Sequence, residues 1–449
     1  MISRRKFLQA TGLGFSALAV PMERLRGQAR SGLSLGEWFA ANQTRLYAVR
    51  EFIRKEMQRI IDRKYQTPRL KGPALPYPYI PVSEAPGFCY LVYWDNYFTT
   101  RLLLRDGHLE VAKNQVRNLI SLMAKYGYVP NGNNYLWADS SQPPLLSRMV
   151  MLIHNFQDDP GFLRECYPDL KQEHEFWQGP LHLVKEYGLN RYQDTFSGWA
   201  KILGYPENFL SNSEAEVEAG WDYTVRFESR CLEFLPVDLN AFLYQYERDL
   251  EFISERLSLG TAEINLWSER ADSRREKFNR IFWDSRREFY FDYDFKHQQP
   301  GRVWSLAGYL PIWAGLADQG RIEKAIKALA RFEQAYGLSV TDQDYGKTSK
   351  QWDYPNAWPP LTWWVEEVLQ QNGFVEQARR AIRQYLEATT SLYEDTGSLW
   401  EKYNAVTGGL DTVGGPGYKP VPMLGWSASV FMDFYDLAAK AAKSVETRP

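Results

Sequence analysis

The stretch that decides the fold reads Gln351-Trp352-Asp353-Tyr354-Pro355-Asn356-Ala357-Trp358-Pro359-Pro360. It combines two tryptophans, three prolines, two amides and a carboxylate, a mixture that suits neither an amphipathic helix nor an alternating strand. Because proline fixes φ and biases the preceding residue toward extended geometry, Tyr354 and Trp358 are expected at defined angles without regular hydrogen bonding. The sequence therefore predicts a rigid, ordered loop here.

The chemistry of this segment leaves two interpretations open. Flat aromatic faces next to a carboxylate and amides suit a pyranose ring, which needs stacking for its C–H face and hydrogen bonds for its hydroxyls. The alternative is a buried aromatic plug that closes one end of a domain, because tryptophan is more often a core residue than a site residue.

The composition narrows the class of partner. The 449 residues include 53 Lys and Arg against 55 Asp and Glu, which gives no reason to expect nucleic acid or an anionic membrane. A neutral small molecule such as a sugar fits better. The chain is long enough to bury a large core. Its 16 Trp, 28 Tyr and 24 Phe suit a sugar-binding cleft and a helical core equally.

The first residues have the pattern of an export signal. Ser3-Arg4-Arg5-Lys6-Phe7-Leu8 precedes a mild apolar run over residues 9–20 and small residues at 27–29. The run is too short and too rich in Gly and Ala for a membrane span, so residues 1–29 are interpreted as a twin-arginine signal peptide. A periplasmic or secreted protein, with no membrane contact in its mature form, is expected. The alternative is a buried amphipathic first helix.

Long stretches carry the 3.6-residue period of amphipathic helices. They run from Leu109 to Met123, from Leu239 to Ile253, from Ile322 to Phe332 and from Trp364 to Leu369. The protein is therefore predicted to be mainly helical.

Three dipeptides, Tyr126-Gly127, Tyr187-Gly188 and Tyr336-Gly337, are interpreted as helix ends at which glycine takes the left-handed C-cap conformation. Each precedes a short extended piece and then a polar or aromatic cluster, so the functional loops are expected after helices. This organisation is typical of an all-α, α/α toroid. We expect one domain over residues 86–440, preceded by an N-terminal extension over residues 30–85 that wraps the barrel.

Hydrolysis of a glycosidic bond without a metal needs two carboxyl groups, one protonated and one ionised. The first candidate is Asp222, whose aromatic neighbours Trp221 and Tyr223 would desolvate the carboxyl and favour its protonated form. The alternative is an N-cap aspartate that opens the next helix.

The second candidate is Glu401. A Glu-Lys pair on an exposed helix is the alternative, but Trp400 and Tyr403 on either side and the glycine pairs that follow favour a loop.

The segment 351–360 fills every position of the second trehalase signature, Gln-Trp-Asp-x-Pro-x-Gly/Ala/Val-Trp-x-Pro, so the chain resembles the trehalases of glycoside hydrolase family 37. The resemblance runs from residue 86 to residue 432. Gly220-Trp221-Asp222 matches the motif that carries the general acid in that family. Glu401-Lys402-Tyr403-Asn404 is similar to Glu-Lys-Tyr-Asp, whose glutamate is the general base, although Asn404 stands where the family has aspartate.

The resemblance implies an (α/α)6 toroid that cleaves α,α-trehalose to two glucose molecules with inversion. It also implies a set of substrate-binding residues, carried over position by position: Trp94, Asp95, Asn131, Gln142, Glu207, Gln351, Trp352, Asp353 and Trp358.

The departures concern mainly arginine. The family has arginine where this chain has Cys89, Ser140 and Tyr205, and its glycine-rich lid carries a glutamate that is missing from the segment 414–418. A glutamine of the family falls near Val421. Each unpaired buried group would cost about 1–3 kcal/mol at the transition state. An inverting α-glucosidase acting on a different α-glucoside is therefore the alternative function, and a sugar-binding protein without activity is a third.

Other signals are absent from the sequence. The five histidines show no metal-ligand spacing, and there is no phosphate-binding glycine loop and no Gly-x-Ser-x-Gly motif. The three cysteines are widely spaced and imply no disulfide framework. We expect no metal, no cofactor, no nucleic-acid partner and a monomer.

Overall fold

The computed structural model describes most of the chain from residue 32 onward, namely residues 32–68, 71–135, 137–193, 207–346, 350–414 and 419–446. The predicted signal peptide lies outside these residues. The chain divides into two compact units. Unit 1 comprises Met1–Arg63, Ser83–Cys89 and Ala328–Pro449, and unit 2 comprises Lys64–Val82 and Tyr90–Lys327.

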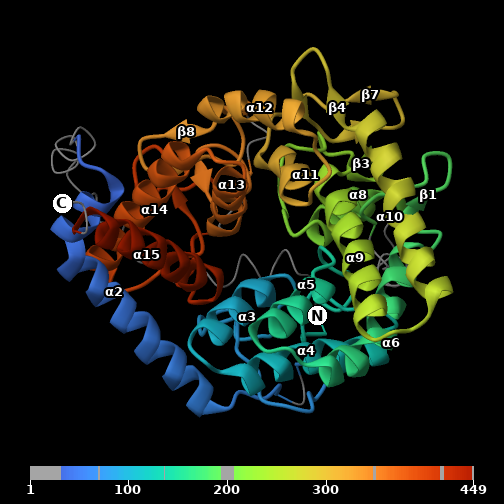
Figure 1. Cartoon of the computed structure of the whole chain (residues 1–449), viewed down its shortest axis with the longest axis horizontal. Coiled ribbons are helices and arrows are strands. Elements are labelled where there is room, and N and C mark those ends of the chain that lie inside the picture. Colours follow the sequence, from blue (N-terminus) through green and yellow to red (C-terminus); the bar gives the residue numbers. More distant parts are fainter. Residues whose placement is uncertain are drawn as a thin grey trace. The chain divides into compact units, whose positions relative to one another are not determined.

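Four helices make up most of the part of unit 1 that the structure describes (Figure 1). These are α2 (Leu35–Arg63), α13 (Pro359–Gln371), α14 (Val375–Thr396) and α15 (Gly425–Glu446), with a 3₁₀ turn over Ala328–Arg331. Its strands have two residues each and form two antiparallel pairs, β8 (Glu333–Gln334) with β9 (Gly337–Leu338), and β10 (Asn356–Ala357) with β11 (Tyr403–Asn404).

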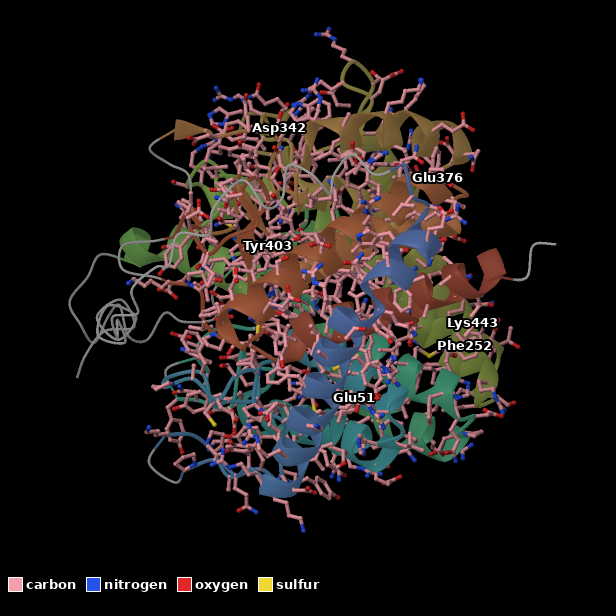
Figure 2. All side chains as sticks on the ribbon, turned by 90° about the vertical axis from the view of Figure 1, so that its left-hand side faces the viewer. Glu51, Phe252, Asp342, Glu376, Tyr403 and Lys443 are labelled. Carbon is pink, nitrogen blue, oxygen red and sulfur yellow. The ribbon has the colours of Figure 1, made fainter. Side chains whose placement is uncertain are left out.

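The long helix α2 occupies the segment that was expected only to be a wrapping extension. Its N-terminus is a capping box, in which the Ser34 backbone N–H donates to Oε2 of Glu37 at 2.7 Å and the Glu37 N–H donates to the Ser34 hydroxyl at 3.3 Å. The helix packs against α14 and α15, and Glu51 marks it in Figure 2. Its buried stripe has helical spacing: Leu46, Val49, Ile53, Met57 and Ile60.

Unit 2 contains the remaining helices (Figure 1). They are α3 (Asp95–Arg105), α4 (Leu109–Tyr126), α5 (Leu146–Phe156), α6 (Pro160–Trp177), α8 (Glu207–Glu218), α9 (Val237–Arg256), α10 (Thr261–Ile281), α11 (Leu310–Trp313) and α12 (Gln319–Lys327), with 3₁₀ turns at Cys231–Glu233 and Leu306–Tyr309.

The strands of unit 2 also have two residues each and form small antiparallel sheets. The strands are β1 (Leu183–Val184), β2 (Leu189–Asn190), β3 (Phe234–Leu235), β4 (Trp283–Asp284), β5 (Phe289–Tyr290), β6 (Tyr293–Asp294) and β7 (Gln299–Pro300). β1 pairs with β2, β4 pairs with β5, and β3, β6 and β7 form one sheet in that order.

The predicted helical stripes fall on real helices. The stripes from Leu109 and Leu239 lie on α4 and α9, and their apolar members are buried. The stripe from Trp364 lies on α13. The stripe from Ile322 is only partly correct, because α12 ends at Lys327 and a 3₁₀ turn follows.

Two of the three predicted helix ends are wrong. Tyr126 does end α4, and Gly127 takes a left-handed φ of 83°. Tyr187-Gly188 instead forms the turn between β1 and β2, while Tyr336 lies in the connection from β8 to β9 and Gly337 is the first residue of β9. Gly188 and Gly337 have φ of 60° and 144°. A positive-φ glycine serves a hairpin turn as well as a helix C-cap, so the dipeptide alone does not separate the two.

No helix in the described part of the chain is both long enough and apolar enough to cross a membrane.

Candidate active site

Three tryptophans of unit 1 form the centre of the segment that decides the fold. The rings of Trp352 and Trp358 stack face to face, with centroids 3.7 Å apart and planes 7° from parallel. The Trp426 ring, on α15, meets both rings edge-on at 6.3 and 5.7 Å. Trp352 and Trp358 are only 1% and 2% exposed. The interpretation of this segment as a buried aromatic cluster is therefore correct for these two rings, and their stacking fixes the shape of the loop.

The polar residues of the same segment bind its backbone into one conformation. The Trp358 indole N–H donates to the Gln351 carbonyl at 2.8 Å, and the Asn356 amide donates to the same carbonyl at 2.9 Å. The Lys350 N–H donates to Oδ2 of Asp353 at 2.6 Å. The prediction of an ordered loop is confirmed, except that β10 lies inside the segment and α13 begins at Pro359.

Glu401 lies in unit 1 beside this loop, in the connection that follows α14. Its side chain is 6% exposed, and its backbone is fixed on both sides. The Glu401 N–H donates to the Val421 carbonyl at 3.1 Å, and the Trp426 indole donates to the Glu401 carbonyl at 3.0 Å. The alternative of an exposed Glu-Lys pair on a helix is therefore wrong.

Lys402 connects Glu401 to the tryptophan loop. Its ammonium nitrogen lies 3.0 Å from Oε1 of Glu401 and 3.3 Å from Oε1 of Gln351, and 4.7 Å from the centroid of the Trp358 ring. Unit 1 thus brings together Gln351, Trp352, Asp353, Trp358 and Glu401, five of the predicted site residues.

Asn404 has a structural reason to differ from the family's aspartate. Its amide oxygen accepts from the N–H groups of Val406 and Thr407, at 2.8 and 3.2 Å, while its amide nitrogen donates to the carbonyl and Oδ2 of Asp411, at 3.0 and 3.2 Å. An amide supplies both an acceptor and a donor, whereas a carboxylate at this position would face another carboxylate.

Unit 2 gathers a second group of predicted site residues. Asp95 is the first residue of α3, and both it and Trp94 are buried. The Trp94 N–H donates to Oε1 of Gln142 at 3.1 Å. The carbonyl of Asn131 accepts from the Tyr93 N–H at 2.9 Å, which fixes the two loops together.

The loop with Asp222 follows α8 and passes directly beside Trp94. Gly220 has φ of 70°, and a Cβ at this position would lie 2.9 Å from the Trp94 ring. Tyr223, directly after Asp222, also has a positive φ of 65°, a conformation that is costly for a bulky residue and is frequent at functional sites. Asp222 itself is partly exposed and opens no helix, so the N-cap alternative is wrong.

A buried ion cluster adjoins the Asp222 loop, and the sequence did not reveal it. The Arg226 guanidinium binds the carboxylates of Asp238 and Asp292, with distances from 2.8 to 3.0 Å. Burial raises the pKa of Asp292, although the charge of Arg226 acts in the opposite direction. Burial also opposes the charge of Arg226, yet the two carboxylates raise its pKa above the ordinary value.

Glu218, at the C-terminal end of α8, is a second group missed by sequence reasoning. Its buried carboxylate accepts from the N–H of Gln193 at 2.7 Å and lies 3.1 Å from Nε2 of His182. It also accepts from the N–H of Ser141 at 3.4 Å. Nothing in the sequence indicated that Glu218 contacts these distant residues. Its position just before the Gly-Trp-Asp motif was the one signal that could have marked it as a candidate site residue.

Two predicted features lie at the edge of the described chain. Glu207 begins α8, and its side chain lies outside the described residues, as do Tyr205 and the lid residues 415–418.

Ser140, where the family has arginine, is fully buried. Its hydroxyl meets no hydrogen-bond partner among the residues that the structure describes.

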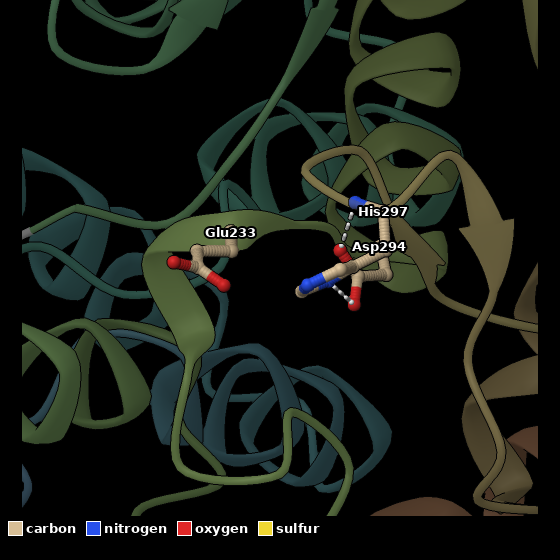
Figure 3. A group of neighbouring side chains, drawn as sticks. All are labelled: Glu233, Asp294 and His297. Carbon is tan, nitrogen blue, oxygen red and sulfur yellow. Dashed lines mark hydrogen bonds and ion pairs between the residues drawn. The ribbon is translucent and has the colours of Figure 1, made fainter.

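One cluster has the residue types of a metal site. Glu233, Asp294 and His297 place ligand atoms within 4.8 Å of one another (Figure 3). Oδ1 of Asp294 accepts from the His297 N–H at 2.9 Å, and Arg230 donates to Oε2 of Glu233 at 2.6 Å and to Oδ2 of Asp294 at 2.7 Å. The guanidinium already neutralises these carboxylates, so the donor set fits an arginine better than a metal ion.

Comparison with known proteins identifies the family of the chain. The profile of the family described as Trehalase matches residues 50–201 and 206–439. A probable trehalase from Oryza sativa subsp. japonica is 29% identical over an alignment of 417 positions, and the match covers 81% of this chain and 73% of that protein.

Two solved structures have a similar fold. The neutral trehalase of Saccharomyces cerevisiae matches with a TM-score of 0.67 and 24% identity, over 80% of this chain and 74% of that chain. A GH63 mannosylglycerate hydrolase from Thermus thermophilus, in complex with glucose, matches with a TM-score of 0.60 and 19% identity, over 79% of this chain and 95% of that chain. The fold class is therefore the predicted all-α, (α/α)6 toroid. Since the family profile covers most of its length, the chain belongs to the trehalase family of glycosidases.

Proposed function

We propose that this protein hydrolyses α,α-trehalose to two glucose molecules with inversion at the cleaved bond. Asp222 is the general acid and Glu401 is the general base. The observation that carries the assignment is that both carboxyl groups of the trehalase motifs lie on loops among buried aromatic rings, with Glu401 oriented by Lys402 and by its own backbone.

The reaction needs one proton transfer at each carboxyl group. Glu401 takes a proton from water, whose oxygen forms the new bond to the anomeric carbon from the face opposite the leaving group. Asp222, in its protonated form, gives its proton to the glycosidic oxygen as the carbon–oxygen bond breaks. The attacked glucose leaves as the β anomer, and the other glucose keeps its α configuration.

The predicted sugar contacts divide between the two units. Trp94, Asp95, Asn131 and Gln142 belong to unit 2 with Asp222, and the residues of the tryptophan loop belong to unit 1 with Glu401. Amide and carboxylate groups are suited to sugar hydroxyls, since they supply both donors and acceptors. Glu207 is included on the family motif alone.

The test is proton NMR of the purified protein with α,α-trehalose, following the anomeric signals during the first minutes. Equal initial release of β- and α-glucose supports the proposal. Release of α-glucose alone contradicts inversion, and release of no glucose contradicts the substrate.

The second candidate is the same chemistry on a different α-glucoside. One observation favours it: the position of a family arginine is taken by Ser140, which is fully buried and whose hydroxyl meets no hydrogen-bond partner among the described residues. A serine cannot replace the several fixed donors of a guanidinium. A panel of α-linked glucosides with different leaving groups decides between the two, because the preferred substrate has the highest kcat/KM.

We also propose that residues 1–29 are a twin-arginine signal peptide that directs export of the mature protein to the periplasm or the medium, as the paired Arg4 and Arg5 suggest. Fractionation of cells, with Arg4 and Arg5 both changed to lysine as the control, tests this assignment. Retention of the variant in the cytoplasm supports the proposed export.

Size-exclusion chromatography with light scattering tests the expected monomer.

A further inference from the structure

The guanidinium of Arg226 is among the most tightly held groups of unit 2. The residue is 1% exposed. Its nitrogens donate to both oxygens of Asp238, at 2.8 and 2.9 Å, and to both oxygens of Asp292, at 2.8 and 3.0 Å. Bidentate pairs of this kind fix the plane of the guanidinium as well as its position.

The two carboxylates are themselves anchored to secondary structure. Asp238 lies in the first turn of α9, and Oδ1 of Asp292 accepts from the N–H of Val237, the first residue of that helix, at 2.9 Å. Asp292 directly precedes β6, which pairs with β3. The plane of the guanidinium is therefore set by the N-terminus of α9 and by the small sheet.

The indole ring of Trp221 stacks on the plane of the Arg226 guanidinium. The centroid of the Trp221 ring lies 4.1 Å from the guanidinium carbon of Arg226, and the Phe227 ring lies at 4.8 Å. Trp221 is fully buried and is the residue directly before Asp222. A planar cation with its edges bound to carboxylates and its face on indole fixes that ring in a way that lysine cannot reproduce.

The backbone on both sides of Asp222 is thus constrained. On one side Trp221 stacks on Arg226, and Gly220 packs under the Trp94 ring. On the other side Tyr223 has a positive φ. The Thr224 hydroxyl accepts from the backbone N–H of Arg226 at 3.2 Å. Strained backbone of this kind persists only where its surroundings determine it.

We propose that Arg226 is a positioning residue for the hydrolytic reaction. Through the Trp221 ring it fixes the backbone at Asp222, so that the carboxyl group of Asp222 meets the glycosidic oxygen. The inference rests on the proposed function, in which Asp222 is the general acid. A displacement of about 1 Å at a reacting group costs about 100-fold in rate.

A substrate whose leaving group needs no proton separates this role from a merely structural one. In α-D-glucosyl fluoride the carbon–fluorine bond breaks and fluoride departs as an anion. Glu401 still takes a proton from the attacking water, and the new carbon–oxygen bond still forms. Proton delivery from Asp222 is required for trehalose and is dispensable for the fluoride.

The experiment compares kcat on the two substrates for Arg226→Lys and Trp221→Leu. We expect kcat on trehalose to fall about 100-fold for each variant, and kcat on the fluoride to fall less than about threefold. An equal loss on both substrates, or no loss on either, overturns the inference. If Arg226→Lys gives no folded protein by circular dichroism, Trp221→Leu decides, because it removes the ring and leaves the ion cluster intact.

Arg274 provides a matched control in the same unit. It is also a buried arginine, 4% exposed, and it binds Glu247 at 2.9 Å, Asn190 at 2.9 Å and Asn240 at 3.1 Å, none of which belongs to the Asp222 loop. Any loss of rate in Arg274→Lys should be the same for the two substrates. A selective loss on trehalose in this control would show that the ratio does not report on Arg226, and would overturn the inference.

Asp222→Asn distinguishes failure of the inference from failure of the proposed function. This variant should lose trehalose turnover and keep turnover of the fluoride. If it loses both substrates equally, Asp222 is not the acid and the proposed function is wrong. If it behaves as expected while Arg226→Lys does not, the positioning role alone is wrong.

Discussion

The ammonium nitrogen of Lys402 lies 3.0 Å from Oε1 of Glu401, its neighbour in the chain, and both side chains are buried. Adjacent residues in an extended chain point in opposite directions, so this pair requires the bend that the Val421 and Trp426 hydrogen bonds impose on residue 401. Because Lys402 also donates to Gln351, the pair joins the proposed catalytic carboxylate to the tryptophan loop.

Removing the ammonium group should leave the Glu401 carboxylate buried and uncompensated. We expect Lys402→Met to lower the free energy of unfolding by about 3–5 kcal/mol, measured by urea denaturation. The double variant with Glu401→Gln should be less destabilised than the sum of the two single variants. Additive effects within about 0.5 kcal/mol would show that the pair contributes no coupling energy.

Loss of Glu401, the proposed general base, should be compensated by a nucleophile that does not need to be deprotonated. Glu401→Ala should hydrolyse α-D-glucosyl fluoride about 100- to 10,000-fold more slowly than the unchanged protein. Added azide should restore turnover and give β-glucosyl azide, detected by NMR. Formation of the α-azide, or no rescue together with normal hydrolysis, would contradict the role of Glu401.

Glu173 should make the stability of unit 2 depend on pH near neutrality. Burial raises the pKa of this carboxyl from 4.5 to about 7, although it accepts hydrogen bonds from the hydroxyls of Tyr93 and Tyr246. Between these two pH values the folded protein keeps a proton on Glu173 that the unfolded chain releases. Stability should therefore be greatest below pH 4.5 for this group and decline as pH rises to about 7, by on the order of 3 kcal/mol in total.

The variant Glu173→Gln tests that dependence. Its free energy of unfolding, measured between pH 5 and pH 8, should vary less with pH than that of the unchanged protein, since an amide mimics the neutral acid. Identical slopes for the two proteins would show that Glu173 does not titrate in this range.

Asn404→Asp should restore the residue of the family motif and yet destabilise this chain. The amide nitrogen that donates to Asp411 at 3.2 Å would become a carboxylate oxygen facing another carboxylate. We expect a loss of about 1–3 kcal/mol at pH 7, read from thermal and urea unfolding. Asp411→Asn in the same chain should recover most of the loss, and failure to recover would assign the cost to another contact.

Local patterns predicted the helices and the loop well. The apolar period of α4, α9 and α13 is set by the face that each helix buries, so it can be read from the sequence. The same period runs along α2, from Leu46 to Ile60, inside the segment 30–85 that was expected to be a wrapping extension.

The failures have a physical cause in each case. Tyr187-Gly188 and Tyr336-Gly337 have the same local chemistry as a true helix end, and only strand pairing makes them parts of hairpins. The Arg226 cluster brings together residues 226, 238 and 292, whose pairing depends on the folded backbone. Sequence patterns describe neighbours along the chain, whereas such clusters depend on contacts between distant segments.

The pairing of α2 with α15 carries a consequence for the timing of folding. The ring centroids of Phe39 on α2 and Tyr435 on α15 lie 5.1 Å apart. Nη2 of Arg45 on α2 lies 2.7 Å from Oε2 of Glu394 on α14. Ribosomes add about 5–20 residues per second, so the first turn of α2 waits roughly 20–80 s for its partner on α15 to be synthesised. During that interval its apolar stripe lacks this cover, and exposed apolar surface of this kind makes a folding intermediate prone to aggregate.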